Sequence, residues 1–137
     1  MADFNIAYAK TAKNEGGYTN NSKDNGNWTG GKVGSGILIG TNYGISAPVL
    51  MKFLGRVPTV EDMKNISIDT VKKIYRKDYW NIIRGDEILI QEISNSVYDS
   101  AVNMGAGTAI KLSQRALKMA ETGKMDDATL NALNNKT

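Results

Sequence analysis

One acidic residue stands where the first amphipathic segment of the chain ends. Glu15 precedes Gly16 and Gly17, which leave room for a bulky ligand, and nine positions later comes Asp24. A glycine-rich segment follows and closes at Thr41. Hydrolysis of a glycosidic bond needs a protonated acid beside the leaving oxygen, and most enzymes add a second carboxylate that attacks the sugar or activates water. These residue types and their order favour a small hydrolase that cuts polysaccharide.

Each of these residues also has an ordinary structural explanation. A Glu before two glycines can be a surface residue ahead of a helix stop, Asp24 suits a turn, and Thr41 suits a loop. As a general acid, Glu15 would have to keep its proton near neutral pH, which requires a raised pKa. The negative end of a helix and an apolar wall would both raise it. The ordered set of three residues favours the catalytic interpretation.

The composition limits the chemistry that the chain can perform. Its 137 residues suit one domain with a hydrophobic core. There is no Cys and no His, which excludes disulfides, thiolate metal sites and Ser-His-Asp or Cys-His catalysis. Carboxylates, hydroxyls, amides, Lys or Tyr must do any catalysis, and no metal or cofactor is implied. The net charge of +3 is a mild bias towards anionic partners, but the basic residues are spread along the chain.

A targeting or membrane signal would lie in the first residues or in an apolar segment. The first residues, Met1-Ala2-Asp3-Phe4-Asn5, lack the basic leader and apolar run of a signal peptide. No segment approaches the roughly 18 apolar residues of a membrane span. We therefore expect no stable membrane insertion. We also expect the protein to act on the cell wall, which it would reach by another means of export, after loss of a leader, or by release during phage lysis.

Periodicity predicts a helix first and a loop lobe second. Four residues at helical spacing indicate a first helix over residues 3–15: Phe4, Ala7, Tyr8 and Ala12. Residues 16–44 are rich in Gly, Asn, Thr and Ser and predict a loop, with a short hairpin around 32–33 and 37–39. A loop of this length in a compact domain is usually functional or disordered. Its aromatic residues favour an ordered loop that faces a ligand.

Helical patterns return after residue 44. Ser46 as N-cap with Pro48 in the first turn predicts a helix to Leu54, and Thr59 with Asp62 resembles the capping box of a short helix at 60–64. Further helices are expected from Ser67 to about 79, at 87–104, around 109–119 and at 126–133. The inward faces of the first two of these should hold Val71, Ile74, Tyr75, Tyr79, Leu89, Ile93, Val97 and Ala101. The helix around 109–119 is marked by the spacing of Ala109, Leu112, Ala116 and Met119. The sequence thus predicts a mainly α fold with one small loop and β-hairpin lobe after the first helix.

The order of the motifs resembles that of the glycoside hydrolase family 108 peptidoglycan muramidases, once called secretion activator proteins. The similar segments lie at 15–18, 24, 41–46, 74–80, 99–105 and 112–117, so the resemblance covers nearly the whole chain. It implies a lysozyme-like domain over residues 1–137, with Glu15 as general acid. It also implies the Glu, Asp and Thr set of phage-type lysozymes, in which Asp24 and Thr41 would hold the attacking water.

The chain departs from the family pattern in two places. The family usually reaches its Thr about five residues after the Asp. Thr29 keeps that spacing, whereas Thr41 keeps the Tyr-Gly-Ile context after an insertion of about twelve residues. We favour Thr41, because the residues that follow it fix the course of the backbone. The second departure is the short segment at about 106–137, where relatives commonly continue into a peptidoglycan-binding segment.

The resemblance implies a substrate and its contacts. The bond cleaved would be the β-1,4 link between N-acetylmuramic acid and N-acetylglucosamine in a peptidoglycan glycan strand, with no nucleic-acid partner and a monomeric enzyme. Tyr18, Trp28, Asn42 and Tyr43 would contact the glycan, although Trp28 and Tyr43 could equally be buried in the local core. The alternatives are a non-catalytic peptidoglycan-binding module, a lytic transglycosylase of the same fold and, from the basic charge alone, a small DNA-binding protein.

Two polar pairs outside the loop lobe have structural interpretations. Asp99 and Asn103 lie one turn apart on an expected helix, where they could tie neighbouring backbone into place or line the substrate cleft. Gln114 is expected to act similarly. Arg84 and Asp86 flank a glycine between two expected helices, and we expect them to pair with each other.

Overall fold

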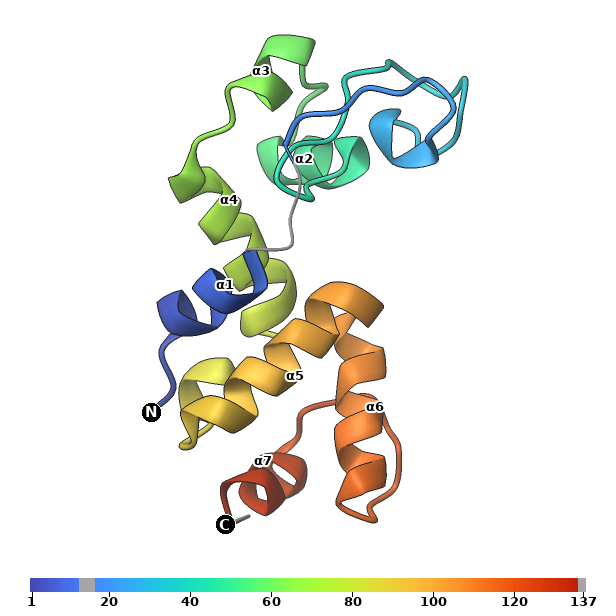
Figure 1. Ribbon diagram of the computed structural model, residues 1–137. Coiled ribbons are helices and arrows are strands. Elements are labelled where there is room, and N and C mark those ends of the chain that lie inside the picture. Colours follow the sequence, from blue (N-terminus) through green and yellow to red (C-terminus); the bar gives the residue numbers. More distant parts are fainter. Residues whose placement is uncertain (13–16, 136–137) are drawn as a thin grey trace. The chain divides into compact units, whose positions relative to one another are not determined.

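A computed structural model of the protein describes residues 1–12 and 17–135. These residues form a mainly helical fold, as predicted (Figure 1). The helices are α1 (Phe4–Ala12), α2 (Ala47–Leu54), α3 (Val60–Lys64), α4 (Ile68–Tyr75), α5 (Gln91–Met104), α6 (Ala106–Ala116) and α7 (Asp127–Asn134). Within the described ranges, no helix has the length and apolar character needed to cross a bilayer.

The chain divides into two compact units. Residues 1–13 and 72–137 form one, which we call the helical unit, and residues 14–71 form the other, which we call the loop unit. The boundary falls within α4, between Val71 and Lys72. The organisation as a single lysozyme-like domain stays a prediction.

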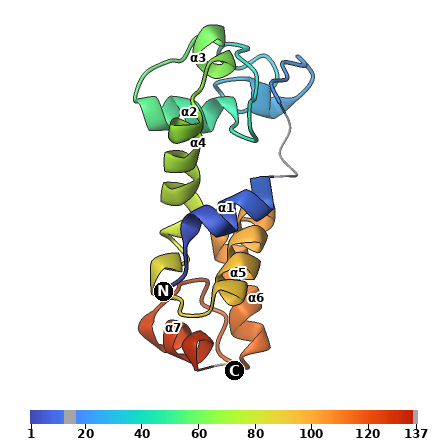
Figure 2. The same cartoon turned by 60° about the vertical axis from the view of Figure 1, so that its left-hand side comes forward.

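The helical unit is built around α5. Helix α1 lies across one side of α5 and α6 packs along it, as the two views in Figures 1 and 2 agree. The rings of Phe4, Trp80 and Tyr98 form a cluster with centroids 5.6–5.8 Å apart, in the edge-on geometry that aromatic pairs favour. Gly85 lies directly against the Trp80 indole, so that a β-carbon at this position would overlap the ring.

Buried polar side chains attach α7 to the rest of the helical unit. Gln114, which is 1% exposed, donates from its amide to the hydroxyls of Thr122 and Thr129 and to the Lys124 carbonyl. It also accepts a hydrogen bond from the Gly123 N–H. Gln114 therefore ties neighbouring backbone into place, as expected.

The helical unit differs from the pattern expected from the sequence at three places. Arg84 pairs with Glu87 and Asp127, while Asp86 accepts a bidentate bond from Arg76. Leu89 is 58% exposed, because α5 begins only at Gln91 and Leu89 lies outside the helix. The buried face of α6 consists of Ala106, Ala109, Ile110 and Gln114, with Leu112 and Ala116 exposed.

Local capping signals set the helices of the loop unit. Ser46 is the N-cap of α2, and Pro48 lies in its first turn. At α3, the Thr59 hydroxyl accepts from the Asp62 N–H, and the Asp62 carboxylate accepts from the Thr59 N–H, which completes the predicted capping box. At α4, the Ser67 hydroxyl accepts from the Thr70 N–H. These bonds satisfy N–H groups that have no partner inside their own helix.

The α3 cap predicts a dependence of stability on acid. The hydrogen bonds from the Arg56 guanidinium and the Thr59 N–H lower the pKa of Asp62 to about 2. A group with a depressed pKa stabilises the fold fully above its unfolded pKa, and the contribution is lost as pH falls towards the folded value. The wild type should therefore exceed Asp62→Asn in resistance to urea at pH 5, and the gap should close between about pH 4 and 2. An equal gap at pH 5 and pH 2 would contradict this assignment.

The segment between α1 and α2 is held by isolated antiparallel bridges. These join Thr19 with Thr41, Trp28 with Leu38, and Asn42 with Ile45. The expected hairpin is present, but its first side consists of residues 28–30: Thr29 and Gly30 donate to the carbonyls of Ile37 and Ser35, and residues 32–33 lie in the turn. Glycines at positions of positive φ, among them Gly31, Gly34 and Gly36, let the chain make this turn.

Candidate functional site

The proposed acid, Glu15, lies outside the described residues, which resume at Gly17. The described part of the candidate site therefore consists of Asp24, Thr41 and their surroundings, all in the loop unit. Thr19, four residues after Glu15 in the sequence, pairs with Thr41 through two backbone hydrogen bonds of 2.8 Å. Thr19 is thus fixed beside the proposed threonine, Thr41.

Asp24 opens a turn of 3-10 helix over Asn25–Asn27. Its Oδ1 accepts a hydrogen bond of 3.0 Å from the Gly26 N–H, the usual arrangement of an aspartate at a helix N-cap. The residue is exposed. One carboxylate oxygen therefore fixes the side chain, which leaves acceptor capacity in an ionised carboxylate for a further hydrogen-bond donor.

Thr41 is half-buried, and its hydroxyl lies close to two acceptor oxygens. Its Oγ1 lies 2.6 Å from the Asn27 Oδ1 and 3.4 Å from the Gly26 carbonyl oxygen. A hydroxyl has one hydrogen, and the shorter contact is the one to which it donates. The lone pairs of Thr41 Oγ1 remain as acceptors.

Gly26 brings the two side chains together. A β-carbon placed on Gly26 would lie 3.6 Å from Asp24 Oδ1, 3.9 Å from Thr41 Oγ1 and 3.7 Å from the Ser46 β-carbon. The carboxylate and the hydroxyl therefore flank the same glycine, although they lie seventeen positions apart in the sequence. The missing side chain at Gly26 leaves the space that both oxygens border.

Thr29, the other candidate threonine, has a different environment. It is 5% exposed, and its hydroxyl accepts a hydrogen bond of 2.9 Å from the Ile37 N–H. A β-carbon on Gly36 would overlap the Thr29 side chain. Thr29 thus holds the hairpin closed, while Thr41 is the threonine beside Gly26.

Two of the three aromatic residues predicted to contact glycan, Tyr18 and Trp28, make hydrogen bonds within the loop unit. The Tyr18 hydroxyl donates to the Ile39 carbonyl at 2.9 Å, and the ammonium of Lys64 lies 5.5 Å from its ring centroid. The Trp28 indole N–H donates to the Ser22 carbonyl at 2.9 Å. Both residues are half-buried, and their predicted contacts with glycan stay predictions.

Asn42 and Tyr43 form the turn that leads into α2. Asn42 is 5% exposed, and its amide donates to the carbonyl oxygens of Met63 and Lys64, which ties the turn to the end of α3. Tyr43 has a φ of 51°, and Gly44 follows with 74°. Positive φ at both central residues is the mark of the tight turns that join antiparallel strands. The predicted contacts of these residues with glycan stay predictions.

Asn27 is the residue of this cluster that the sequence did not reveal. It is fully buried, and its amide joins Thr41 to the Asn21 carbonyl. One more Asn in a stretch rich in Asn and Gly has no distinguishing pattern, since neither helical nor strand periodicity applies in a loop.

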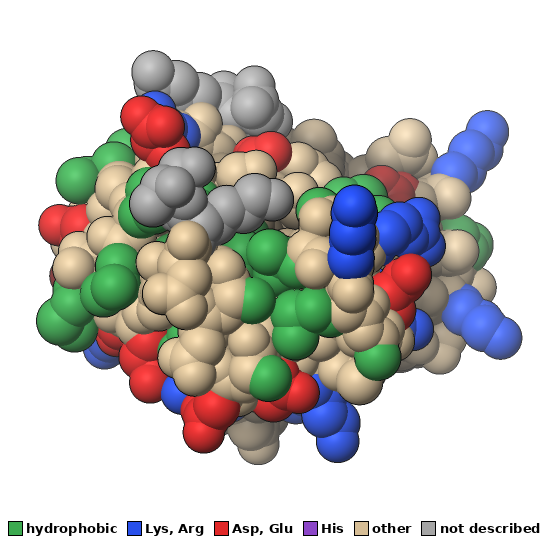
Figure 3. Space-filling model, turned by 90° about the horizontal axis from the view of Figure 1, so that it is seen from below, with side chains coloured by type: hydrophobic (Ala, Val, Ile, Leu, Met, Phe, Trp, Pro, Cys, Tyr) green, Lys and Arg blue, Asp and Glu red, His purple; other side chains and the backbone are tan. Residues whose placement is uncertain are grey.

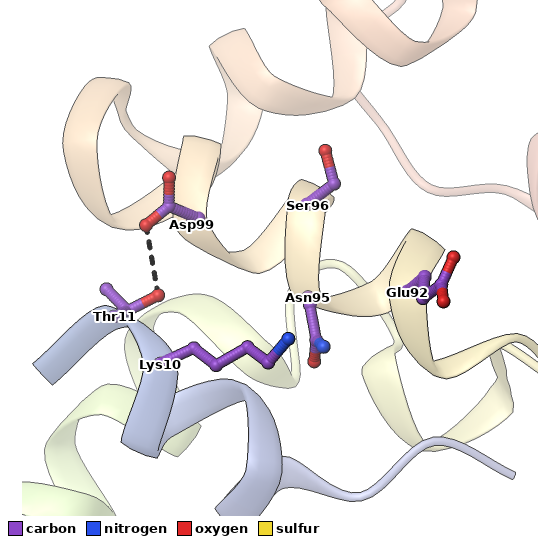
Figure 4. A pocket seen from close by; sticks show the side chains of 6 residues that line it. All are labelled: Lys10, Thr11, Glu92, Asn95, Ser96 and Asp99. Carbon is purple, nitrogen blue, oxygen red and sulfur yellow. Dashed lines mark hydrogen bonds between the residues drawn. The ribbon is translucent and has the colours of Figure 1, made fainter.

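A separate depression of about 300 Å³ lies in the helical unit between α1 and α5 (Figure 4). Asp99 lines it and accepts a hydrogen bond of 3.0 Å from the Thr11 hydroxyl, while Asn103 donates to its other oxygen at 3.3 Å. Asp99 therefore joins the Thr11 side chain of α1 to α5 and borders the depression, whereas Asn103 is exposed and neither bond goes to the backbone. Figure 4 shows Lys10 reaching along the same depression towards Asn95.

The grouping of charged side chains in the described residues bears on a metal site and on a basic surface. In the part of the chain that the structure describes, no three His, Cys, Asp or Glu side chains are grouped to hold a metal ion. On the face shown in Figure 3, Lys and Arg side chains stand at several separate places with acidic ones among them.

Comparisons with known proteins agree on one family. The sequence profile described as Glycosyl hydrolase 108 matches residues 8–105, a span that includes Glu15, Asp24 and Thr41 and ends just after α5. Among solved structures, the chain is similar to SagA of Brucella abortus, with a TM-score of 0.74 and 28% identity over 98% of this chain and 70% of that one. No curated protein matched the chain.

Proposed function

The chain belongs to glycosyl hydrolase family 108, and from that premise we propose that it is a peptidoglycan N-acetylmuramidase with Glu15 as its general acid. The substrate would be the glycan strand, cut at the β-1,4 bond between N-acetylmuramic acid and N-acetylglucosamine. The observation that carries the proposal is the pair of oxygens, Asp24 Oδ1 and Thr41 Oγ1, beside Gly26 in a member of this family.

The reaction that fits this pair is a single displacement by water. Glu15 gives its proton to the leaving glycosidic oxygen as the bond from that oxygen to the anomeric carbon breaks. A water molecule held by Asp24 and Thr41 forms the new bond to the anomeric carbon, and its proton passes to the Asp24 carboxylate. Because the water attacks from the face opposite the leaving group, the product has inverted configuration.

The surrounding residues would bind and orient the strand. Tyr18, Trp28 and Tyr43 are half-buried and would stack on sugars, and Asn42, which is buried, would support the turn that carries Tyr43. We propose that the enzyme acts as a monomer on the cell wall, reached by export or by release during phage lysis, where its activity would be bacteriolytic. The reaction requires no metal or cofactor.

Product analysis tests this proposal. Purified peptidoglycan is digested in water enriched in oxygen-18, and the released fragments are weighed by mass spectrometry. We expect reducing muramic acid ends that carry one heavy oxygen. Anhydro ends without label would identify a lytic transglycosylase, in which the sugar's own hydroxyl replaces water. Binding to peptidoglycan without release of fragments would identify a non-catalytic module.

A further inference from the structure

We propose that Asn27 is a positioning residue, which fixes the direction of the Thr41 hydroxyl so that this hydroxyl can only accept a hydrogen bond from the attacking water. The inference rests on the proposed function, because it assigns a purpose to the contact between Asn27 and Thr41. The observations are the full burial of Asn27 and the 2.6 Å separation of its Oδ1 from Thr41 Oγ1.

The orientation of the Asn27 amide is fixed by its second partner. Its Nδ2 donates to the Asn21 carbonyl at 2.9 Å. A rotation of the amide by half a turn would bring its oxygen against that carbonyl oxygen and leave two acceptors facing each other. The amide nitrogen therefore points to Asn21, and the amide oxygen points to Thr41.

The backbone of Asn27 is held as firmly as its side chain. Its carbonyl accepts from the N–H groups of Ile39 and Gly40, both at 3.0 Å, and its N–H donates to the Asp24 carbonyl at 3.2 Å. Asn27 thus connects the backbone of Asp24 with the side chain of Thr41. A residue fixed at so many points holds the hydroxyl without the cost of ordering it during the reaction.

The fixed direction of the Thr41 hydroxyl determines how the attacking water uses its two hydrogens. An ionised Asp24 carboxylate can only accept hydrogen bonds, and the Thr41 hydroxyl already donates its hydrogen to Asn27. A water molecule between them therefore donates one hydrogen to each. Its lone pairs then remain for the anomeric carbon. Without the Asn27 amide, the Thr41 hydroxyl could turn to the Gly26 carbonyl, 3.4 Å away, or donate to the water itself. Donation to the water would engage a lone pair that the attack needs.

A double-mutant cycle tests this role. The variants are Asn27→Leu, Thr41→Val and the two combined, each close in size to the wild type, with kcat and KM measured on soluble peptidoglycan chains. We expect Thr41→Val to lower kcat by about 100-fold and Asn27→Leu by about 10-fold, with KM little changed. If Asn27 acts through Thr41, the double variant has the kcat of Thr41→Val alone. Fold-losses that multiply would overturn the inference, as would a wild-type kcat in Asn27→Leu.

Two further variants separate positioning from loss of fold. Gln114→Met removes another buried amide with several hydrogen bonds, in the helical unit, and should lower stability while leaving kcat unchanged. Asn27→Asp can imitate the amide when its new carboxyl is neutral, by donating to Asn21 and accepting from Thr41. Its kcat should approach the wild-type value at acidic pH and decline as pH rises, relative to the wild type. An Asn27→Asp profile parallel to that of the wild type would contradict the proposal.

The same measurements distinguish a failure of the proposed function from a failure of the inference about Asn27. A wild-type kcat in Thr41→Val would overturn the part given to Thr41 in the proposed function. A loss in Thr41→Val without a loss in Asn27→Leu would overturn only the inference about Asn27. Thr29→Val, which removes the hydroxyl that bonds to Ile37, is the matched threonine control and should affect stability more than kcat.

Discussion

Replacement of Glu15 by Gln should lower kcat for release of reducing ends from peptidoglycan by about 10²–10⁴-fold, the range associated with loss of a general acid or base. The amide has the size of the carboxyl but cannot give a proton to the leaving oxygen. Binding of the strand should be little affected, so KM and pelleting with insoluble peptidoglycan should stay close to the wild type. The measurement is an assay of new reducing ends, with pelleting as the second readout.

A glutamate elsewhere in the loop unit provides the control. Glu61 is exposed on α3, and Glu61→Gln makes the same change of charge and size away from Asp24 and Thr41 in the sequence. It should keep wild-type kcat. If Glu15→Gln and Glu61→Gln were equally active, Glu15 would not be the acid, and the catalytic assignment of this chain would fail. Circular dichroism of both variants shows whether a loss of activity comes from a loss of fold.

The starts of α2, α3 and α7 were predictable because the signals that set them are local. Thr59 and Asp62 form the expected capping box, and Asp126 caps α7 through the Thr129 N–H. Such a bond joins residues three positions apart, so it depends on the sequence alone. Pro48 likewise fixes its own φ and tolerates the first turn of α2 without help from the rest of the fold.

The inward faces and ion pairs were less predictable because their partners come from other elements. Leu112 has helical spacing with Ala109, yet the buried face of α6 includes Gln114. A polar side chain is buried there because residues 122–129 supply its hydrogen-bond partners. Arg84 pairs with Asp127 on α7 as well as with nearby Glu87, so the choice of partner depends on where α7 packs. No local pattern contains that information.

Some residues of the candidate site could be predicted from the sequence and others could not. Asp24 and Thr41 could be named from the sequence, because the order of acid and hydroxyl carries chemical meaning. The sequence favoured Thr41 over Thr29, and the structure adds that Thr29 bonds to Ile37 whereas Thr41 lies beside Gly26. Asn27 could not be named, because its significance lies in its burial and in the Thr41 hydroxyl fourteen residues further along the chain.

The space beside Gly26 gives the second large effect. Gly26→Ala should lower kcat by about 100-fold, because the new methyl group would touch both Asp24 Oδ1 and Thr41 Oγ1 and displace water from the space that they share. The contacts of 3.6–3.9 Å are ordinary van der Waals distances, and Gly26 is not among the residues with positive φ. An alanine therefore fits without strain, and stability should be unchanged or raised by about 0.4–1 kcal/mol through a less flexible unfolded chain.

A loss of activity without a loss of stability is what separates this variant from a folding defect. Gly107→Ala on α6 serves as the control, since its methyl group would meet no atom within 4 Å, and it should keep wild-type kcat. Urea unfolding and kcat are measured on both variants. A Gly26→Ala enzyme with wild-type kcat would mean that the attacking water does not occupy the space beside Gly26. Because the methyl group alters neither oxygen chemically, a large loss would point to the water itself rather than to the charge of Asp24 or the hydroxyl of Thr41.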